Sequence, residues 1–133
     1  MQREMTMGEL KLLLYVAVGG ALGSVCRYMA AGFLKDTGNG TFPWHMIFVN
    51  TFGCLLVGFF VSVLYAKLPH PRWVSLFYWG FIGGFTAFSS FIKEGMHFFL
   101  SGEHVTGLLY LVLQNSLGLA AGVCAFWIGR VLL

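Results

Sequence analysis

The sequence predicts an all-α integral membrane protein, with four transmembrane helices in a single domain that covers residues 1–133. Of the 133 residues, 58% are hydrophobic and 10% are charged, whereas about a quarter of the residues of a soluble protein are charged. A helix needs about 20 apolar residues to cross a bilayer core, so this length accommodates four spans and their turns. The net charge of +3 is small and dispersed, which argues against a nucleic-acid partner.

Polar turns divide the chain into four apolar segments, and the expected spans are residues 8–34, 44–66, 73–100 and 105–133. The turns are residues 35–43, rich in Asp, Asn and Gly, then 67–72, which is basic and holds two prolines, and 101–104. No Ala-x-Ala cleavage site follows the first apolar segment, so we expect a retained span rather than a signal peptide. The expected location is multi-pass in the cell (inner or plasma) membrane.

The first span carries small residues at helical spacing. The pairs Gly19/Gly23 and Gly20/Ser24 predict a surface where another helix approaches closely. Arg27 follows on the same segment, and a guanidinium within a bilayer must reach the interface or border water. Two interpretations of Arg27 remain open, snorkelling toward the next turn and a position at a pore mouth.

The second and fourth spans carry isolated polar side chains. Asn50 needs a partner in lipid, so it either forms an interhelical hydrogen bond or lines a permeation path. Tyr110 and Gln114 are spaced i, i+4 and share one helix face, which is either glue between helices or a hydrated track. Gly118 and Gly122 predict another close helix contact.

The third span contains a stretch, residues 83–91, that disfavours a continuous helix. The adjacent glycines Gly83 and Gly84 weaken a helix, and the hydroxyls of Thr86, Ser89 and Ser90 compete for backbone hydrogen bonds. The stretch predicts a break at mid-membrane depth, where freed backbone groups need a partner, an ion or a water-lined cavity. The alternative is a small-residue surface that only allows close packing.

The chain holds no catalytic or metal-binding motif in its sequence. It has no nucleophile–base set, phosphate-binding loop or cluster of metal ligands, so we do not expect an enzyme. Cys26, Cys54 and Cys124 are odd in number, form no CxxC motif and lie in apolar sequence. We expect them to be small buried hydrophobic residues.

Three segments together carry a family resemblance: GGALGSVCRY in the first span, FVNTFGCLLVG in the second and GFIGGFTAFSSFIKE in the third. With this order and spacing the chain resembles the small fluoride channels of bacteria and archaea, the CrcB or Fluc family. The resemblance implies an antiparallel, dual-topology homodimer with two fluoride pores and a structural sodium ion at its centre. It also implies passive, fluoride-selective export that relieves fluoride toxicity.

The resemblance also implies roles for individual residues. Backbone carbonyls of Gly83 and Thr86 would hold the sodium ion, and Arg27 would lie near the vestibule. The positive ring edges of two phenylalanines and an amide NH2 group would offer fluoride donors without a full charge that traps it. The pore residues implied in this way are Asn50, Phe88, Phe91, Ser89, Ser90, Tyr110 and Gln114.

The sequence departs from the family pattern at a few positions. The usual TTFSTF reads TAFSSF here, from Thr86 to Phe91. Met46 replaces a threonine that often stands four residues before the pore asparagine, and Gln114 stands where a serine is more usual. Glu94 matches a carboxylate that the family commonly carries after the motif.

Two other classes of membrane protein compete with the channel. A small multidrug exporter needs a carboxylate in its first span, but the sequence has no acid between Lys11 and Asp36. A non-conducting assembly subunit would not need the polar stretch in the third span. The basic residues are nearly balanced between the two faces, which favours insertion in both orientations. The expected partners are therefore fluoride, the lipid bilayer and a second copy of the chain.

Overall fold

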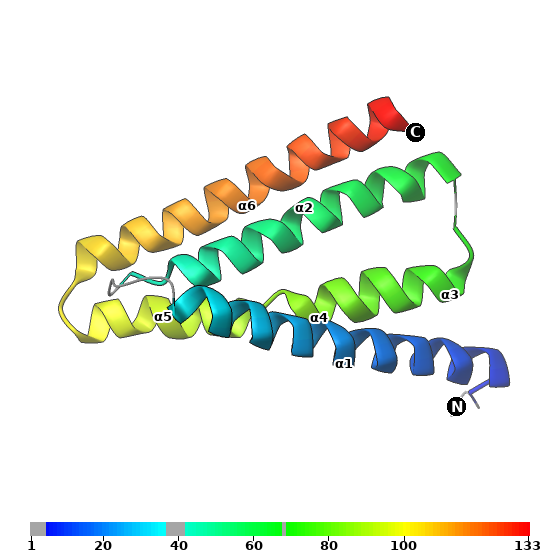
Figure 1. Cartoon of the computed structure of the whole chain (residues 1–133), viewed down its shortest axis with the longest axis horizontal. Helices are drawn as coiled ribbons and strands as arrows, with labels where there is room; N and C mark the ends of the chain where they lie inside the picture. The colour runs from blue at the N-terminus through cyan, green and yellow to red at the C-terminus, as the bar shows by residue number, and fades with distance from the viewer. Residues whose placement is uncertain (1–4, 37–41, 68) are drawn as a thin grey trace.

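The computed structural model describes residues 5–36, 42–67 and 69–133, and these residues form helices joined by short turns (Figure 1). Four helical stretches are long and apolar enough to cross a membrane, Met7–Lys35, Trp44–Lys67, Pro71–Leu100 and His104–Leu132. Their bounds agree with the predicted spans to within two residues. Residues 37–41 of the first predicted turn, and residue 68 of the second, lie outside the described residues.

The third stretch is divided into several elements, whereas the other three are single helices. The single helices are α1 (Met7–Asp36), α2 (Trp44–Lys67) and α6 (His104–Leu132). The third stretch comprises α3 (Pro71–Trp73), the π-helix η1 (Val74–Ile82), α4 (Gly83–Phe85) and α5 (Phe88–Leu100). Both chain ends lie at the same end of the bundle (Figure 1).

Helix α1 packs against η1 and α4 through glycines, which confirms the predicted contact surface of the first span. A Cβ atom on Gly19 would overlap the carbonyl oxygen of Leu76, and one on Gly23 would overlap that of Phe81. From the other side, Gly84 brings α4 directly against the backbone of α1. Only residues without a Cβ permit this approach, so the sequence of both helices is constrained here.

Helices α2 and α6 form the second closely packed pair. A Cβ on Gly58 of α2 would overlap the carbonyl oxygen of Gly122, and one on Gly118 would lie 3.2 Å from the Sγ of Cys54. The predicted close packing at Gly118 and Gly122 is therefore confirmed. The fold consists of two tightly packed helix pairs, with α5 lying against α6.

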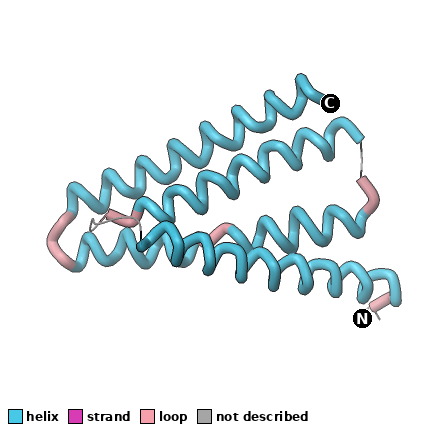
Figure 2. The backbone as a smooth tube through the Cα atoms, in the orientation of Figure 1, coloured by secondary structure: helices cyan, strands magenta, loops and turns pink. Residues whose placement is uncertain are grey.

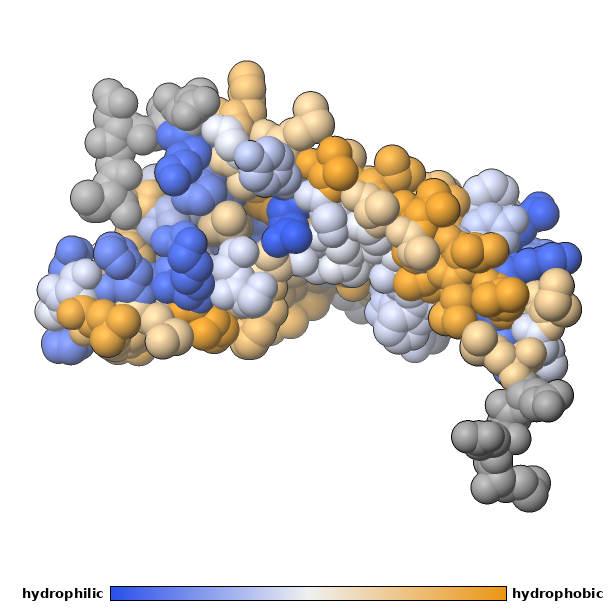
Figure 3. Space-filling view, turned by 90° about the horizontal axis from the view of Figure 1, so that it is seen from below, coloured by the Kyte–Doolittle hydropathy of each residue, from blue (hydrophilic) through white to orange (hydrophobic). Residues whose placement is uncertain are grey.

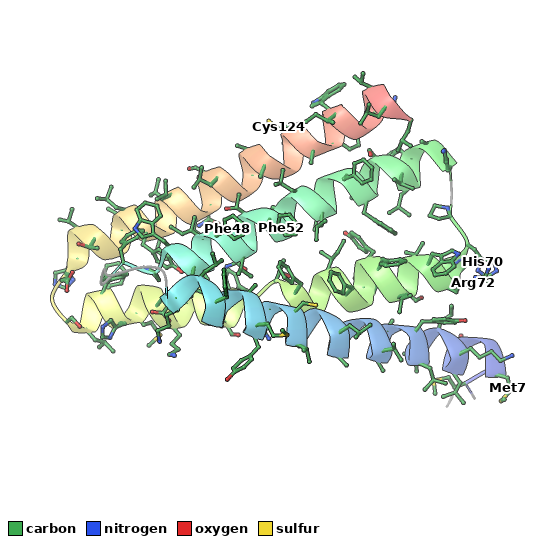
Figure 4. The ribbon with its side chains drawn as sticks, viewed as in Figure 1. Met7, Phe48, Phe52, His70, Arg72 and Cys124 are labelled. Atoms are coloured by element: carbon green, nitrogen blue, oxygen red, sulfur yellow. The ribbon has the colours of Figure 1, made fainter. Side chains whose placement is uncertain are left out.

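Much of the apolar surface of the single chain is exposed, and Figure 3 shows hydrophobic side chains over much of the half nearer the N-terminus. The expectation that all three cysteines are buried is wrong. Cys26 and Cys124 are exposed, and Cys54 is partly buried. The reason is that α1 and α6 each pack on one side only, so Cys124 projects away from the bundle (Figure 4).

Helical geometry is interrupted between α4 and α5, where Figure 2 shows a short non-helical segment within the third stretch. Thr86 is extended, with φ −78° and ψ 148°, and Ala87 has φ −139° and ψ 85°. The adjacent glycines were part of the reason to predict a break here. Gly83 and Gly84 nevertheless remain helical, since both belong to α4. Gly84 serves the contact with α1, and the interruption follows two residues later.

Candidate functional site

A side chain from a neighbouring helix stabilises the interruption. The backbone N–H of Ala87 donates to the Oδ1 atom of Asn50 on α2, at 3.1 Å, and both residues are buried. In a continuous helix this N–H would donate to the carbonyl of Gly83, four residues earlier. The backbone N–H and the hydroxyl of Thr86 both donate to the carbonyl of Ile82, at 3.0 and 3.1 Å. Asn50 therefore makes the interhelical bond that was one of its two interpretations.

The amide of Asn50 has a second functional group. Its Nδ2 donates no hydrogen bond within the described part of the chain, while its Oδ1 is occupied by Ala87. Asn50 also lines a groove. The interhelical bond uses only the Oδ1 atom of the amide, so the NH2 group remains available for a second interaction.

The groove has a volume of about 700 Å³ and lies between α2, α6 and the interruption. It brings together five of the predicted site residues, Asn50, Thr86, Phe88, Phe91 and Gln114. Most of the remaining wall is apolar. A few polar groups on an apolar wall are typical of a site that orients a small ligand.

Aromatic rings continue from the groove toward the end of the bundle where α5 meets α6. The Phe88 and Phe91 ring centroids are 5.5 Å apart, and the Phe91 ring is 5.5 Å from that of Tyr110. Phe88 is 72% exposed, whereas Phe91 and Tyr110 are buried. Tyr110 also contacts Phe42 and Phe98, with centroid distances of 5.8 and 6.0 Å.

Two buried polar atoms on α6 lack hydrogen-bond partners in the described structure, the hydroxyl of Tyr110 and the Oε1 of Gln114. The two side chains are spaced i, i+4, which was predicted to place them on one helix face, and they are 0% and 6% exposed. A buried polar group without a partner destabilises the fold. Unpaired polar atoms of this kind are typical of a site that binds water or a ligand.

The remaining predicted residues do not line the groove. Ser89 is exposed, Ser90 and Arg27 are half-buried, and Gly83 is exposed on α4. The Nε of Arg27 is buried without a hydrogen-bond partner among the described residues. Sequence reasoning missed Cys54, which lines the groove and follows Asn50 at i+4, a spacing that places both on one helix face.

Four stretches that can cross a membrane, with a groove between α2 and α6, define a small multi-pass membrane protein. Residues 14–129 match the family described as CrcB-like protein, Camphor Resistance (CrcB). The chain therefore belongs to the CrcB family.

Relatives of similar length carry one functional name. The "Fluoride-specific ion channel FluC" of Desulforapulum autotrophicum is 36% identical over 119 residues, 89% of this chain and 95% of the relative. The protein of the same name from Rhizobium etli is 37% identical over 120 residues, 90% of this chain and 96% of the relative. "Fluoride-specific ion channel FluC 1" of Streptomyces coelicolor is 38% identical over 116 residues, 86% of this chain and 75% of the relative.

Proposed function

We propose that this chain forms a passive, fluoride-selective channel that exports fluoride across the membrane. The observation that carries the proposal is the groove beside the interruption, whose wall includes Asn50 and the paired rings of Phe88 and Phe91. The names of the relatives support the choice of ion. The two competing classes, a small multidrug exporter and a non-conducting assembly subunit, have no comparable support in the groove.

The proposed selectivity follows from how a fluoride ion is dehydrated. Fluoride is small and strongly hydrated, so a pore must replace its water shell with donors at short range. Ring edges and an amide NH2 group are donors without a formal charge, which allows the ion to bind and to leave. The hydroxyl of Tyr110, buried without a partner, would add a donor further along the path.

The proposed assembly is an antiparallel homodimer with two pores. In the single chain the Phe88 ring is 72% exposed although it stands at the groove, and a second copy would cover it and complete the pore wall. An apolar ring beside a polar path gains from such cover. The near balance of basic residues supports insertion of copies in both orientations.

We propose that backbone carbonyls at the interruption hold a structural sodium ion and that the interruption lies at mid-membrane depth. Because Ala87 donates to Asn50, the carbonyl of Gly83 loses its helical donor, and the extended Thr86 directs its own carbonyl away from the helix axis. Gly83 is exposed, so its carbonyl can be reached by a second copy. Carbonyl oxygens are suitable ligands for a hard cation. The sodium ion would be coordinated by carbonyl oxygens of both copies, and would thereby link the interruption of one copy to that of the other.

The test of the channel is fluoride efflux from liposomes that contain the purified protein, driven by a potassium gradient with valinomycin. We expect rapid fluoride efflux and no chloride efflux above that of protein-free liposomes. Equal fluoride and chloride efflux would reject selectivity, and no fluoride efflux would reject the channel.

The test of dual topology is labelling of one cysteine placed in the turn of residues 35–43, in a variant without Cys26, Cys54 and Cys124. An impermeant reagent should label about half of the protein from each side of the membrane, because both orientations insert. Complete labelling from one side would reject dual insertion.

A further inference from the structure

We propose that Cys54 is a modification site on the groove wall, where a small hydrophilic disulfide or thiosulfonate forms a mixed disulfide and thereby reduces anion passage. The effect on passage rests on the channel function proposed above, whereas the site itself does not. Cys54 is a free cysteine, is partly buried and lines the groove. Neither Cys26 nor Cys124 belongs to the groove wall of the described structure, and both are exposed on the outside of the bundle (Figure 4 labels Cys124).

The contact between α2 and α6 determines where the thiol lies. A Cβ atom on Gly118 of α6 would be 3.2 Å from the Sγ atom of Cys54, and one on Gly58 of α2 would overlap the carbonyl oxygen of Gly122. The two helices run side by side in the same direction (Figure 1). Cys54 therefore faces Gly118, and the next turn of α2 faces the next turn of α6.

Polar atoms one turn away from the thiol lack hydrogen-bond partners. The same helix register, continued back by one turn, places Asn50 opposite Gln114. Gln114 is 6% exposed and its Oε1 atom has no partner in the described structure, while the NH2 group of Asn50 remains available. Both residues line the groove with Cys54. Buried donors and acceptors need a partner, and water in this part of the groove satisfies both groups and hydrates the thiol.

Water beside Cys54 matters because the thiolate, rather than the thiol, is the nucleophile. The proton of the thiol passes to water, and the Sγ atom attacks one sulfur atom of the reagent and forms a new S–S bond. The S–S bond of the reagent breaks, and its other half leaves as a thiolate or a sulfinate. Exchange between sulfur atoms needs no further oxidant. A thiol that faces lipid has no water to stabilise its thiolate, so Cys26 and Cys124 react slowly.

The first experiment measures labelling and does not depend on conduction. Wild-type protein in liposomes is treated with 2-sulfonatoethyl methanethiosulfonate on both sides of the membrane, and mass spectrometry of the intact chain and its peptides counts and locates the adducts. We expect rapid labelling of Cys54, with Cys26 and Cys124 at least about tenfold slower because they lie outside the groove. Cys54→Ser should lack the rapid adduct. If Cys54 is labelled no faster than Cys26 and Cys124, the inference is wrong.

The second experiment compares fluoride efflux before and after the same treatment. The adduct adds volume and a negative sulfonate group to a groove of about 700 Å³, so efflux should fall about tenfold. Dithiothreitol should restore it by reducing the mixed disulfide.

Two variants show which cysteine is responsible. The matched control, Cys26→Ser with Cys124→Ser, should keep the wild-type ratio of treated to untreated efflux, whereas in Cys54→Ser treatment should change nothing. Unchanged efflux after complete labelling of Cys54 overturns the inference and leaves the channel intact. Absence of efflux before treatment rejects the channel function itself, and the labelling result alone then decides whether Cys54 is the site.

Discussion

The two halves of the third membrane-crossing stretch are held in place by different kinds of contact. Before the interruption, η1 and α4 lie against α1 by direct approach of backbones at Gly23 and Gly84. After it, α5 lies against α6 through large rings, with Phe91 and Phe98 packed on Tyr110. The first half is thus held by backbone contact, whereas the second half is held by rings that pack on the buried Tyr110.

The interruption lies where these two kinds of packing meet. Close approach fixes the path of α4 relative to α1, and ring packing fixes that of α5 relative to α6. Asn50 of α2 bonds the N–H of Ala87 between them. At the interruption a side chain accepts this hydrogen bond in place of the Gly83 carbonyl, so that carbonyl loses its helical donor.

The largest expected effect on stability comes from a substitution at the glycine contact between α1 and the first half of the third stretch. Gly23→Val would push a Cβ into the carbonyl of Phe81, and overpacking of a rigid contact destabilises a fold by about 3 kcal/mol or more. We expect little monodisperse protein in size-exclusion chromatography and a much lower thermal midpoint. Gly32→Val is the matched control on the same helix, because a Cβ there meets nothing within 4 Å. Equal behaviour of the two variants would contradict the described contact.

The next largest effect is expected at the interruption itself. Asn50→Leu removes the acceptor for the Ala87 N–H and the NH2 group at the groove, so stability should fall by about 1–3 kcal/mol for the unpaired buried donor. Fluoride efflux should fall to background. Asn50→Asp keeps an oxygen acceptor and loses the NH2 group, so it should retain most of the stability and still lose efflux. Normal efflux from Asn50→Asp would remove the amide NH2 group from the proposed path.

Most of the fold could be predicted from the sequence because lipid restricts the possible structures. Long apolar segments can only be helices in a bilayer, and the glycine pairs mark close contacts directly. The i, i+4 spacing of Tyr110 and Gln114 indicated that they share one helix face, and both are buried. These features are local, and each is readable within one segment of the chain.

The position of the interruption could not be predicted to the residue, because it depends on two helices. The sequence indicated a break within residues 83–91, but Gly84 is used for contact with α1, and the helix ends at Thr86, where Asn50 accepts from the next backbone N–H. The exposure of Cys26 and Cys124 was mispredicted for a related reason. Hydrophobicity does not indicate which face of a membrane helix meets another helix. The π-helical form of η1 had no signal in the sequence that we can identify.

Substitution of Gly83 is expected to change the stability of the single chain little. Its larger effect is expected on formation of the proposed dimer. Its Cβ would meet only the carbonyl of Tyr78, at 3.9 Å, so Gly83→Val is compatible with the fold of one chain. In the proposed dimer the added side chain would displace the second copy and the shared sodium ion, so we expect loss of the dimer mass and of fluoride efflux. Thr86→Ala keeps the backbone carbonyl and removes only the hydroxyl bond to Ile82, so it should remain dimeric and conducting. An active Gly83→Val with an inactive Thr86→Ala would show that the hydroxyl, rather than the backbone, is essential.

The smallest expected effect on stability is that of Tyr110→Phe, which keeps the ring contacts with Phe91 and Phe98 and removes only a hydroxyl. Since this buried hydroxyl has no partner within the described residues, its removal should leave the free energy of unfolding unchanged or raise it by about 1 kcal/mol. If the hydroxyl donates to fluoride in transit, efflux should still fall several-fold. Tyr65→Phe is the matched control, because Tyr65 is 73% exposed and its hydroxyl is not in the groove. Unchanged efflux with increased stability would mean that the Tyr110 hydroxyl takes no part in the path, whereas a marked loss of stability would mean that it has a structural partner.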